Sequence, residues 1–333
     1  MCNEKPYYHS IVCGKFYPPH KGHHHLIDVA IEHSDNVTVL VCWRSDETIP
    51  LEKRIECLKE EHPTVNILSI PCIPADDDSP AWGKYTLNIL GFKPNAVFSS
   101  EKYGEPYADA MGCEHVMVDV NRISVPISGT QIRRNPYKYF NYLSPYMKAY
   151  YALRIVVVGA ESTGTTTLAE ALAKRYKTVC VPEYGRTYTR WKYEKAGRDW
   201  FTDEFVHIAK EQNKLEDLYA RNANKVLICD TDSFATMLWH KRYCGCCGYS
   251  VSVNILGENH NTFYILTGDE IPFVQDEDNL RDGEHIRHKM HQEFCDALVR
   301  YGKEYIMVRG SHDQRMKDAV NFINKIMQNT TNE

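Results

Sequence analysis

The first 145 residues alternate short apolar runs with segments in which apolar residues recur at helical spacing. The apolar runs, which predict buried strands, are residues 10–13, 37–42, 65–70, 95–99 and 115–120. Segments 22–34 and 51–61 carry the helical pattern. This alternation predicts a parallel sheet with right-handed crossovers, in which ligands bind at the carboxyl ends of the strands.

The pattern starts again at residue 154 with a β-branched run, which predicts a second buried parallel strand before a helix at 166–176. Further strands are expected at 179–181, 226–229 and 263–266. An aromatic segment at 136–152 lies between the two halves and predicts a helix and a short connector. We therefore predict an α/β protein of two doubly wound parallel-sheet domains, residues 1–148 and 149–333.

Composition narrows the class of protein. The chain has 333 residues, 43% hydrophobic and 25% charged, with a formal net charge of −5, which is ordinary for a soluble globular protein and gives no electrostatic case for nucleic-acid binding. No apolar run reaches membrane-spanning length, and the first eight residues lack a signal-peptide core. We expect a cytoplasmic protein with neither a nucleic-acid nor a membrane partner.

The twelve cysteines fit this expectation. Most stand singly in apolar segments, where a reduced cysteine behaves as a small hydrophobe; these are Cys13, Cys42, Cys57, Cys180 and Cys229. The only cluster, at 244–247, has no second C-x-x-C to complete a zinc site. The pattern favours a loop with reduced thiols over a zinc site.

Residues 10–26 combine a strand, a tight loop and the start of a helix. Gly14 and Gly22 allow backbone to approach a ligand, and His20 and His23 stand at the mouth of the helix. Backbone N–H groups and the positive end of the helix dipole meet there, which predicts a nucleotide-phosphate site.

This stretch, G-K-F-Y-P-P-H-K-G-H, resembles the G-x-F-x-P-x-H-x-G-H signature of the nucleotidyltransferase superfamily, which joins ATP to a phosphate or carboxylate acceptor. The superfamily's second signature, I-S-x-T-x-x-R, stands at 127–133. The resemblance implies that His20, His23 and Arg133 are catalytic. It also implies that ATP contacts Gly14, Lys15, Phe16, Tyr17, Ser128 and Thr130.

Trp43 and Arg44 directly follow the strand at 37–42 and are the candidate acceptor-binding residues. An exposed tryptophan there can stack on a pyridine ring, and the arginine can bind a phosphate. A tryptophan that closes the edge of the core beside a solvated arginine is equally consistent with the sequence. Residues 99–101 end another strand and are candidates for lining the nucleotide.

In the second half, a glycine-bounded loop at 159–164 separates the strand from the helix, as a P-loop requires. The expected ATP cradle consists of Gly159, Glu161, Ser162, Thr163, Gly164, Thr165, Thr166 and Thr167. Thr165 stands where the P-loop lysine normally neutralises phosphate charge. An arginine in a later lid could supply that charge, and the alternative is a non-catalytic phosphate site.

Charged residues recur at the following strand ends, which favours a site over isolated helix caps. Glu183, Tyr184 and Arg186 follow one strand, and Asp230 and Asp232, candidates for Mg²⁺ binding or proton acceptance, follow the next. Thr166 and Asp230 are the candidate Mg²⁺ ligands. Candidate lid residues then come from a later loop: Asp276, Arg281 and Arg287.

A nucleotidyltransferase unit followed by a P-loop kinase unit resembles the NadR-type family, which fuses nicotinamide mononucleotide adenylyltransferase to ribosylnicotinamide kinase. P-E-Y-G-R at 182–186, D-T-D at 230–232 and F-V-Q-D at 273–276 add to this resemblance. It implies a Rossmann-like nucleotidyltransferase domain, a P-loop kinase domain, Mg²⁺ with ATP as co-substrate, and a homo-oligomer.

The implied ligands are small molecules: ATP, nicotinamide mononucleotide, ribosylnicotinamide and NAD. No helix-turn-helix-like segment precedes Ser10, so repressor function is not expected. Two alternatives stay open. In one, the protein is an adenylyltransferase only and the P-loop domain senses nucleotide. In the other, the adenylyl acceptor is a different phosphate, such as a pantetheine or ribitol phosphate.

Overall fold

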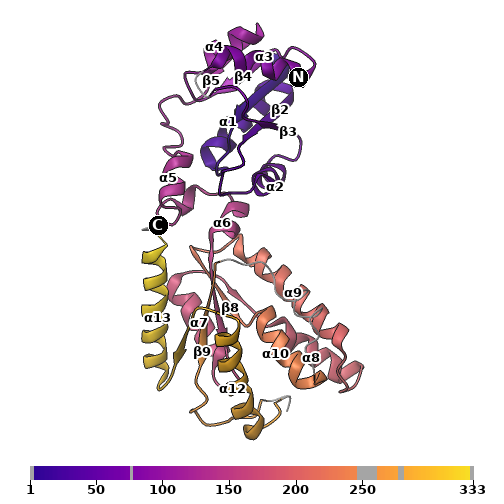
Figure 1. Ribbon diagram of the computed structural model, residues 1–333, viewed down its shortest axis with the longest axis vertical. Helices are drawn as coiled ribbons and strands as arrows, with labels where there is room; N and C mark the ends of the chain where they lie inside the picture. The colour runs from indigo at the N-terminus through magenta and orange to yellow at the C-terminus, as the bar shows by residue number, and fades with distance from the viewer. Residues whose placement is uncertain (1–3, 76–77, 246–260, 277–280, 331–333) are drawn as a thin grey trace. The chain divides into compact units, whose positions relative to one another are not determined.

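The computed structural model describes residues 4–75, 78–245, 261–276 and 281–330. The chain divides into two compact units, Met1–Met147 and Lys148–Glu333 (Figure 1). Each unit contains one five-stranded sheet in which every strand pairing is parallel. The α/β fold with two doubly wound parallel sheets is confirmed.

Unit 1 follows the predicted alternation closely. Its elements are β1 (Tyr7–Gly14), α1 (Lys21–His33), β2 (Ser34–Trp43), α2 (Leu51–Glu61), β3 (Asn66–Pro71), α3 (Ser79–Leu90), β4 (Ala96–Ser99), α4 (Gly104–Met111), β5 (Glu114–Met117), α5 (Gly129–Arg134), the 3₁₀ helix η1 (Phe140–Tyr142) and α6 (Pro145–Tyr151), which crosses the boundary. The strand order is β3-β2-β1-β4-β5. The order reverses between β1 and β4, where ligands bind in such sheets.

The sheet of unit 1 is buried on both faces, which explains its continuous apolar runs. Leu26 and Ile27 of α1 and Leu58 of α2 pack on one face with Val12 and Phe98. The other face is covered by side chains of α3 and α4, including Trp82, Leu87, Tyr107, Ala108 and Met111. With both faces filled, only the ends of the strands remain for a ligand.

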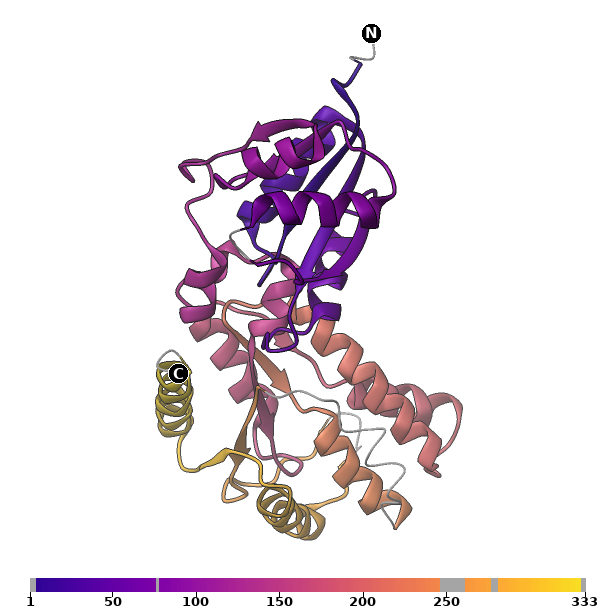
Figure 2. The same cartoon turned by 45° about the horizontal axis from the view of Figure 1, so that its top comes forward.

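Unit 2 consists of β6 (Leu153–Val158), α7 (Thr165–Tyr176), β7 (Cys180–Val181), α8 (Tyr184–Lys195), α9 (Thr202–Ala220), β8 (Val226–Asp230), α10 (Ser233–Cys244), β9 (Thr262–Thr267), α12 (Glu284–Arg300), β10 (Tyr305–Val308) and α13 (His312–Asn329). The strand order β10-β9-β6-β8-β7 places β6, which precedes the P-loop, at the centre. Helices α8, α9 and α10 lie side by side (Figures 1 and 2).

The end of β5 differs from the sequence prediction for a local reason. β5 ends at Met117 rather than at residue 120, because Asp119 adopts φ 47° and its carboxylate accepts backbone N–H groups of Ile123, Ser124 and Val125. These hydrogen bonds close a loop instead of extending the strand.

No helix in the described part of the chain is long and apolar enough to cross a membrane. Cys246, Cys247 and residues 277–280 of the predicted lid lie outside the described residues.

Candidate functional site

Unit 1 has a cavity of about 210 Å³ at the carboxyl end of β1. It is lined by the loop after β1, the first turns of α1, and segments that follow β4 and β5. Its lining residues include Gly14, Lys15, Phe16, His20, His23, His25, Ser100, Glu101, Tyr103, Asp119, Arg122 and Gly129. The glycine-containing loop predicted as a phosphate cradle therefore lies at the switch point of the sheet.

His20 caps α1 through its ring. The Nδ1 atom of His20 accepts backbone N–H groups of Gly22 at 3.1 Å and His23 at 3.4 Å. An accepting Nδ1 cannot carry the proton of a neutral imidazole, so that proton is on Nε2. Nε2 is buried and has no hydrogen-bond partner among the described residues. The cap thus leaves a buried N–H donor in a ring that lines the cavity.

His23 stacks on His20 with ring centroids 3.7 Å apart. Burial, followed by the charge of Arg122, lowers the pKa of His20 to about 3. Burial and the neighbouring imidazoles hold the pKa of His23 well below its ordinary value. Both rings are therefore neutral at neutral pH, and His20 offers phosphate oxygens a hydrogen bond rather than a charge.

Arg122 supplies a cation in the cavity lining that the sequence analysis missed. It donates to the backbone oxygen of Ile127 at 3.0 Å and forms an ion pair with Glu101 at 2.7 Å. Asp119, which shapes the same loop, also lines the cavity. The available signal was the position of Asp119 at the end of the strand predicted at 115–120, and of Arg122 just after it, at the same sheet edge as the first loop.

Several predicted ATP-binding residues lie beside this cavity without lining it. Arg133 stacks over the ring of Tyr17 with its guanidinium carbon 4.5 Å from the ring centroid. Arg133 also donates to the backbone oxygen of Tyr17 and to the hydroxyl of Thr130. Ser128 caps α5 by accepting the N–H of Gln131. These contacts join the segment of the second signature, residues 127–133, to Tyr17 in the first signature, beside the cavity.

The predicted acceptor residues also lie outside the cavity lining. Trp43 is half-buried at the end of β2, and Arg44 is exposed. The backbone oxygen of Trp43 accepts the N–H of Cys72, and the N–H of Arg44 donates to Glu47. The structure thus places the pair at the carboxyl edge of the sheet, as the sequence predicted.

Unit 2 has a larger cavity, of about 340 Å³, at the carboxyl ends of β6, β7 and β8. Of the residues predicted from the sequence, it is lined by Gly159, Glu161, Ser162, Gly164, Thr165, Thr166, Thr167, Glu183, Arg186, Asp230, Asp276 and Arg281. Thr163, Tyr184, Asp232 and Arg287 are not in the lining.

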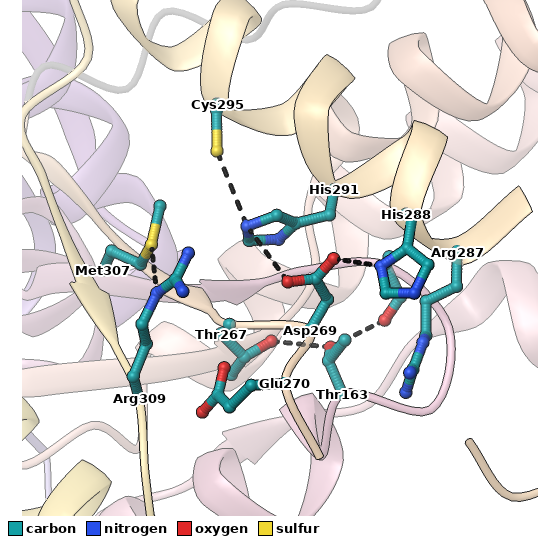
Figure 3. Close-up of polar contacts among 12 residues, drawn as sticks. Thr163, Thr267, Asp269, Glu270, Arg287, His288, His291, Cys295, Met307 and Arg309 are labelled. Atoms are coloured by element: carbon teal, nitrogen blue, oxygen red, sulfur yellow. Dashed lines mark hydrogen bonds and ion pairs between the residues drawn. The ribbon is translucent and has the colours of Figure 1, made fainter. Parts of the chain in front are cut away.

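The P-loop is shaped by glycines and by an internal hydrogen bond. Gly164 adopts φ 82°, and a Cβ on Gly159 would lie 2.2 Å from the hydroxyl of Thr267, so glycine is required at both positions. The hydroxyl of Thr163 donates to the backbone oxygen of Ala160 at 2.7 Å and meets the Thr267 hydroxyl at 2.7 Å (Figure 3). The side chain of Thr163 therefore fixes the P-loop by bonding to the loop's own backbone and to Thr267 at the end of β9.

The segment after β9 is fastened to α12. Asp269 contacts His288 at 2.6 Å and His291 at 3.7 Å (Figure 3). Arg287, from the same helix, is buried and donates to the backbone oxygen of Ile271 at 2.7 Å. Arg287 was predicted as a lid residue; in the structure it is anchored to the segment that follows β9 and is absent from the cavity lining.

The two candidate aspartates have different surroundings. The carboxylate of Asp230 lines the cavity and accepts the hydroxyl of Thr166 at 2.6 Å. Asp232 caps α10, where it accepts the N–H of Ala235 at 2.9 Å and the hydroxyl of Tyr264 at 2.8 Å. Asp230 is therefore placed to contact a ligand in the cavity, whereas Asp232 stabilises the start of α10.

Thr166 and Asp230 fit Mg²⁺, which is bound in nucleotide sites by one or two protein oxygens together with phosphates. Burial raises the pKa of Asp230, so a nearby cation would favour its charged form. Among the described residues, no group of three or more His, Cys, Asp or Glu side chains is placed to hold a metal ion. Any Mg²⁺ at this site would therefore depend on nucleotide phosphates for further ligands.

Thr165, at the P-loop lysine position, also directs its hydroxyl to Asp230. The cations in the described lining are Arg186 and Arg281. Arg186 lies 3.4 Å from Glu183, whose pKa is raised to about 6 by burial and by the charge of Asp230. Two arginines thus face the phosphate loop from the elements expected to supply them.

An aromatic wall, also missed from the sequence, completes the cavity. Trp200, Phe205, Trp239 and Tyr243 line it from α9, α10 and the turn between α8 and α9. The rings of Trp200 and Phe205 lie 4.9 Å apart, and those of Trp200 and Tyr243 lie 5.5 Å apart. Such a wall suits a flat ring or an apolar ligand surface.

Glu161 joins the P-loop to the residues just before α12, and this contact predicts a pH effect on stability. Its carboxylate accepts the N–H of Asp282 at 2.8 Å, and burial raises its pKa from 4.5 to about 7. A raised carboxyl pKa means that its stabilising contribution is present below about pH 4.5 and is lost as pH rises through about 7. In thermal unfolding across this range, Glu161→Gln is expected to show a weaker pH dependence than the parent protein. Equal slopes would contradict the assignment.

Comparison with known families assigns each unit a class. Residues 11–73 match the cytidylyltransferase-like family, and residues 154–315 match the AAA domain family. The two phosphate loops described above fall within these matches. The chain thus joins a nucleotidyltransferase-like unit to a P-loop unit.

The likeness to particular proteins covers nearly the whole chain. The trifunctional NAD biosynthesis/regulator protein NadR of Escherichia coli strain K12 is 27% identical over 95% of this chain and 83% of its own length, and the Salmonella typhimurium protein matches equally. A crystal structure of NadR protein in complex with NR superposes with a TM-score of 0.74 at 20% identity, covering 98% of this chain and 97% of that one. A second, in complex with NAD and AMP-PNP, gives 0.75 at 18% identity, with 96% of each chain covered. The chain is therefore NadR-like, as its motifs predicted.

Proposed function

We propose that this protein acts in NAD biosynthesis through two ATP-dependent reactions, one in each unit. Unit 1 transfers the adenylyl group of ATP to nicotinamide mononucleotide, giving NAD and pyrophosphate. Unit 2 phosphorylates ribosylnicotinamide to the mononucleotide. The observation that carries the proposal is the presence of two built phosphate cradles in one chain that is NadR-like over 95% of its length. NAD, NR and AMP-PNP bound to NadR structures support ligands of these classes.

In unit 1, a phosphate oxygen of the mononucleotide attacks the α-phosphorus of ATP, and pyrophosphate leaves. The Nε2–H of His20 donates to a phosphate oxygen on which charge develops, and Arg122 and Arg133 supply positive charge at the cavity and its rim. No covalent intermediate is required, because the cavity positions both phosphates. Trp43 and Arg44 remain the proposed acceptor contacts.

In unit 2, the 5′-hydroxyl of ribosylnicotinamide attacks the γ-phosphorus of ATP. Thr166 and Asp230 would hold Mg²⁺, which when bound would offset charge on the phosphates. Glu183 accepts the hydroxyl proton, because it lines the cavity and its pKa is raised to about 6. Arg186 and Arg281 neutralise part of the phosphate charge in place of the missing lysine. The aromatic wall stacks on the nicotinamide ring.

Product analysis with purified protein and Mg-ATP tests the proposal. NAD formed from both nicotinamide mononucleotide and ribosylnicotinamide is expected. NAD from the mononucleotide alone would contradict the kinase reaction. It would favour the second candidate function, an adenylyltransferase whose P-loop unit senses nucleotide. The observation that favours this candidate is Thr165 at the position of the P-loop lysine. NAD from neither substrate would contradict the proposed acceptor.

Restoring the P-loop lysine is expected to strengthen ATP binding in unit 2. In Thr165→Lys, the ammonium would meet phosphate oxygens, and charge-assisted hydrogen bonds are worth about 1.5–3 kcal/mol, or roughly 10- to 100-fold in KM for ATP. Thr165→Met, which adds length without charge, is the matched control and should not lower KM. A similar KM for Thr165→Lys and the parent protein would contradict the view that phosphate charge is only partly neutralised.

A further inference from the structure

Arg315 of α13 joins three loops at the carboxyl edge of the sheet in unit 2. The residue is only 5% exposed and lies outside the cavity lining. Its Nη1 donates to the backbone oxygen of Thr163 in the P-loop at 2.7 Å. Its Nη2 donates to the backbone oxygen of Gly268, after β9, at 3.2 Å, and its Nε donates to that of Gly310, after β10, at 3.1 Å. One guanidinium therefore fixes the P-loop relative to two neighbouring loops.

Glu270 is the ion-pair partner of this guanidinium. Its Oε1 accepts from Nη2 of Arg315 at 2.7 Å and from the backbone N–H of Gly310 at 2.7 Å. A Cβ on Gly268 would lie 2.2 Å from Oε2 of Glu270, so the backbone of this loop passes directly against the carboxylate. The guanidinium thus donates four hydrogen bonds, and its planar fork is held in one orientation.

The hydrogen bond to Thr163 determines the direction of a backbone donor in the P-loop. In a trans peptide, such as that between Thr163 and Gly164, the C=O and the N–H point in opposite directions. Because the oxygen of Thr163 faces Arg315, the N–H of Gly164, which lines the cavity, faces away from Arg315. Backbone N–H groups of such a loop are the donors that cradle phosphates. Arg315 therefore orients one of these donors without lining the cavity itself.

We propose that Arg315 is a positioning residue for nucleoside triphosphate binding in unit 2, where the buried Arg315–Glu270 pair holds the P-loop so that the N–H of Gly164 faces a phosphate. The inference rests on the proposed function only for the class of ligand. Thr165 stands in place of the P-loop lysine, so backbone donors carry a larger share of phosphate binding than in a loop with that lysine. The orientation of these donors should therefore have a large effect on affinity.

Hydrogen–deuterium exchange of the full-length protein, titrated with Mg-ATP, tests the proposal, because protection of the peptide that covers residues 159–168 reports on unit 2. Arg315→Met is expected to raise the Mg-ATP concentration for half-maximal protection by at least about tenfold, the effect of losing roughly one hydrogen bond to a charged group. A merely structural role would lower the amount of folded protein without changing this concentration. Arg309→Met is the matched control, because Arg309 is exposed in the same loop as Gly310 and contacts Met307, and it should behave like the parent protein.

Arg315→Lys separates charge from geometry. Lysine keeps the positive charge but lacks the planar fork, so it cannot join three loops, and we expect weaker protection by Mg-ATP than in the parent protein. If circular dichroism shows that Arg315→Met fails to fold, Arg315→Lys decides the question.

Three results would overturn the proposal: an unchanged half-maximal concentration in Arg315→Lys or in folded Arg315→Met, an equal rise in Arg309→Met, or no protection of residues 159–168 by Mg-ATP in the parent protein. Protection that is weakened by Arg315→Met in a protein that does not phosphorylate ribosylnicotinamide would contradict the kinase reaction and still support this inference.

Discussion

Replacing His20 with alanine is expected to reduce the turnover of adenylyl transfer by about 100- to 1,000-fold, the usual effect of removing one preorganised donor to a charged transition state. The donor is the Nε2–H, whose tautomer is fixed because Nδ1 accepts the N–H groups of Gly22 and His23. Its burial without a partner means that no competing hydrogen bond must be broken when phosphate enters. Initial rates of NAD formation from nicotinamide mononucleotide provide the measurement.

Alanine at position 20 also removes the cap of α1, which costs about 1 kcal/mol of stability. His20→Asn separates the two roles, because asparagine is a preferred N-cap residue but its side chain is too short to place a donor where Nε2 lies. We expect both variants to lose turnover and only His20→Ala to show a lower melting temperature. Ribosylnicotinamide phosphorylation in unit 2 serves as an internal control. Normal NAD formation by His20→Asn would contradict a donor role.

The parts of the fold that the sequence predicted are those set by local pattern. Continuous apolar runs followed by glycine-bounded loops located both phosphate cradles, since a buried parallel strand must deliver its following loop to the ligand edge. α2 was predicted with its observed bounds, Leu51–Glu61, because its amphipathic pattern is uninterrupted. The strand that corresponds to β5 was predicted too long. The left-handed conformation of Asp119 and the three backbone N–H groups that its carboxylate accepts cannot be read from the pattern of apolar residues.

Motifs predicted which residues approach a site but not the direction of every side chain. Thr163 lies within the P-loop, yet its hydroxyl points to Thr267, which is 104 residues away in sequence. Asp232 stands two residues from Asp230 but caps α10 and meets Tyr264. Arg122 was missed for the converse reason: it has no motif, and its place in the cavity depends on a loop conformation. Such contacts are properties of tertiary structure.

Asp230 lines the cavity of unit 2 and Asp232 does not, so a substitution at Asp230 is expected to have the second large effect on activity. Asp230→Asn is expected to reduce phosphorylation of ribosylnicotinamide by at least about 100-fold, because metal-assisted charge stabilisation is worth several kcal/mol and each 1.4 kcal/mol corresponds to tenfold in rate. Burial raises the pKa of Asp230, so a neutral replacement removes an unfavourable buried charge. Loss of turnover with an unchanged or higher melting temperature is therefore the expected signature, measured by coupled ADP release and thermal unfolding.

Asp232→Asn is the matched control. Asparagine still caps α10 through its side-chain oxygen, and its amide can donate to the hydroxyl of Tyr264, so the fold should persist. Because Asp232 does not line the cavity, phosphorylation should fall by less than about fivefold, a change of roughly 1 kcal/mol in the barrier. Adenylyl transfer in unit 1 should be unaffected in both variants. If Asp232→Asn lost activity while Asp230→Asn kept it, the assignment of the metal site would be reversed. Equal losses in both would indicate that the cap positions Asp230 at the end of β8 and that the two residues act together.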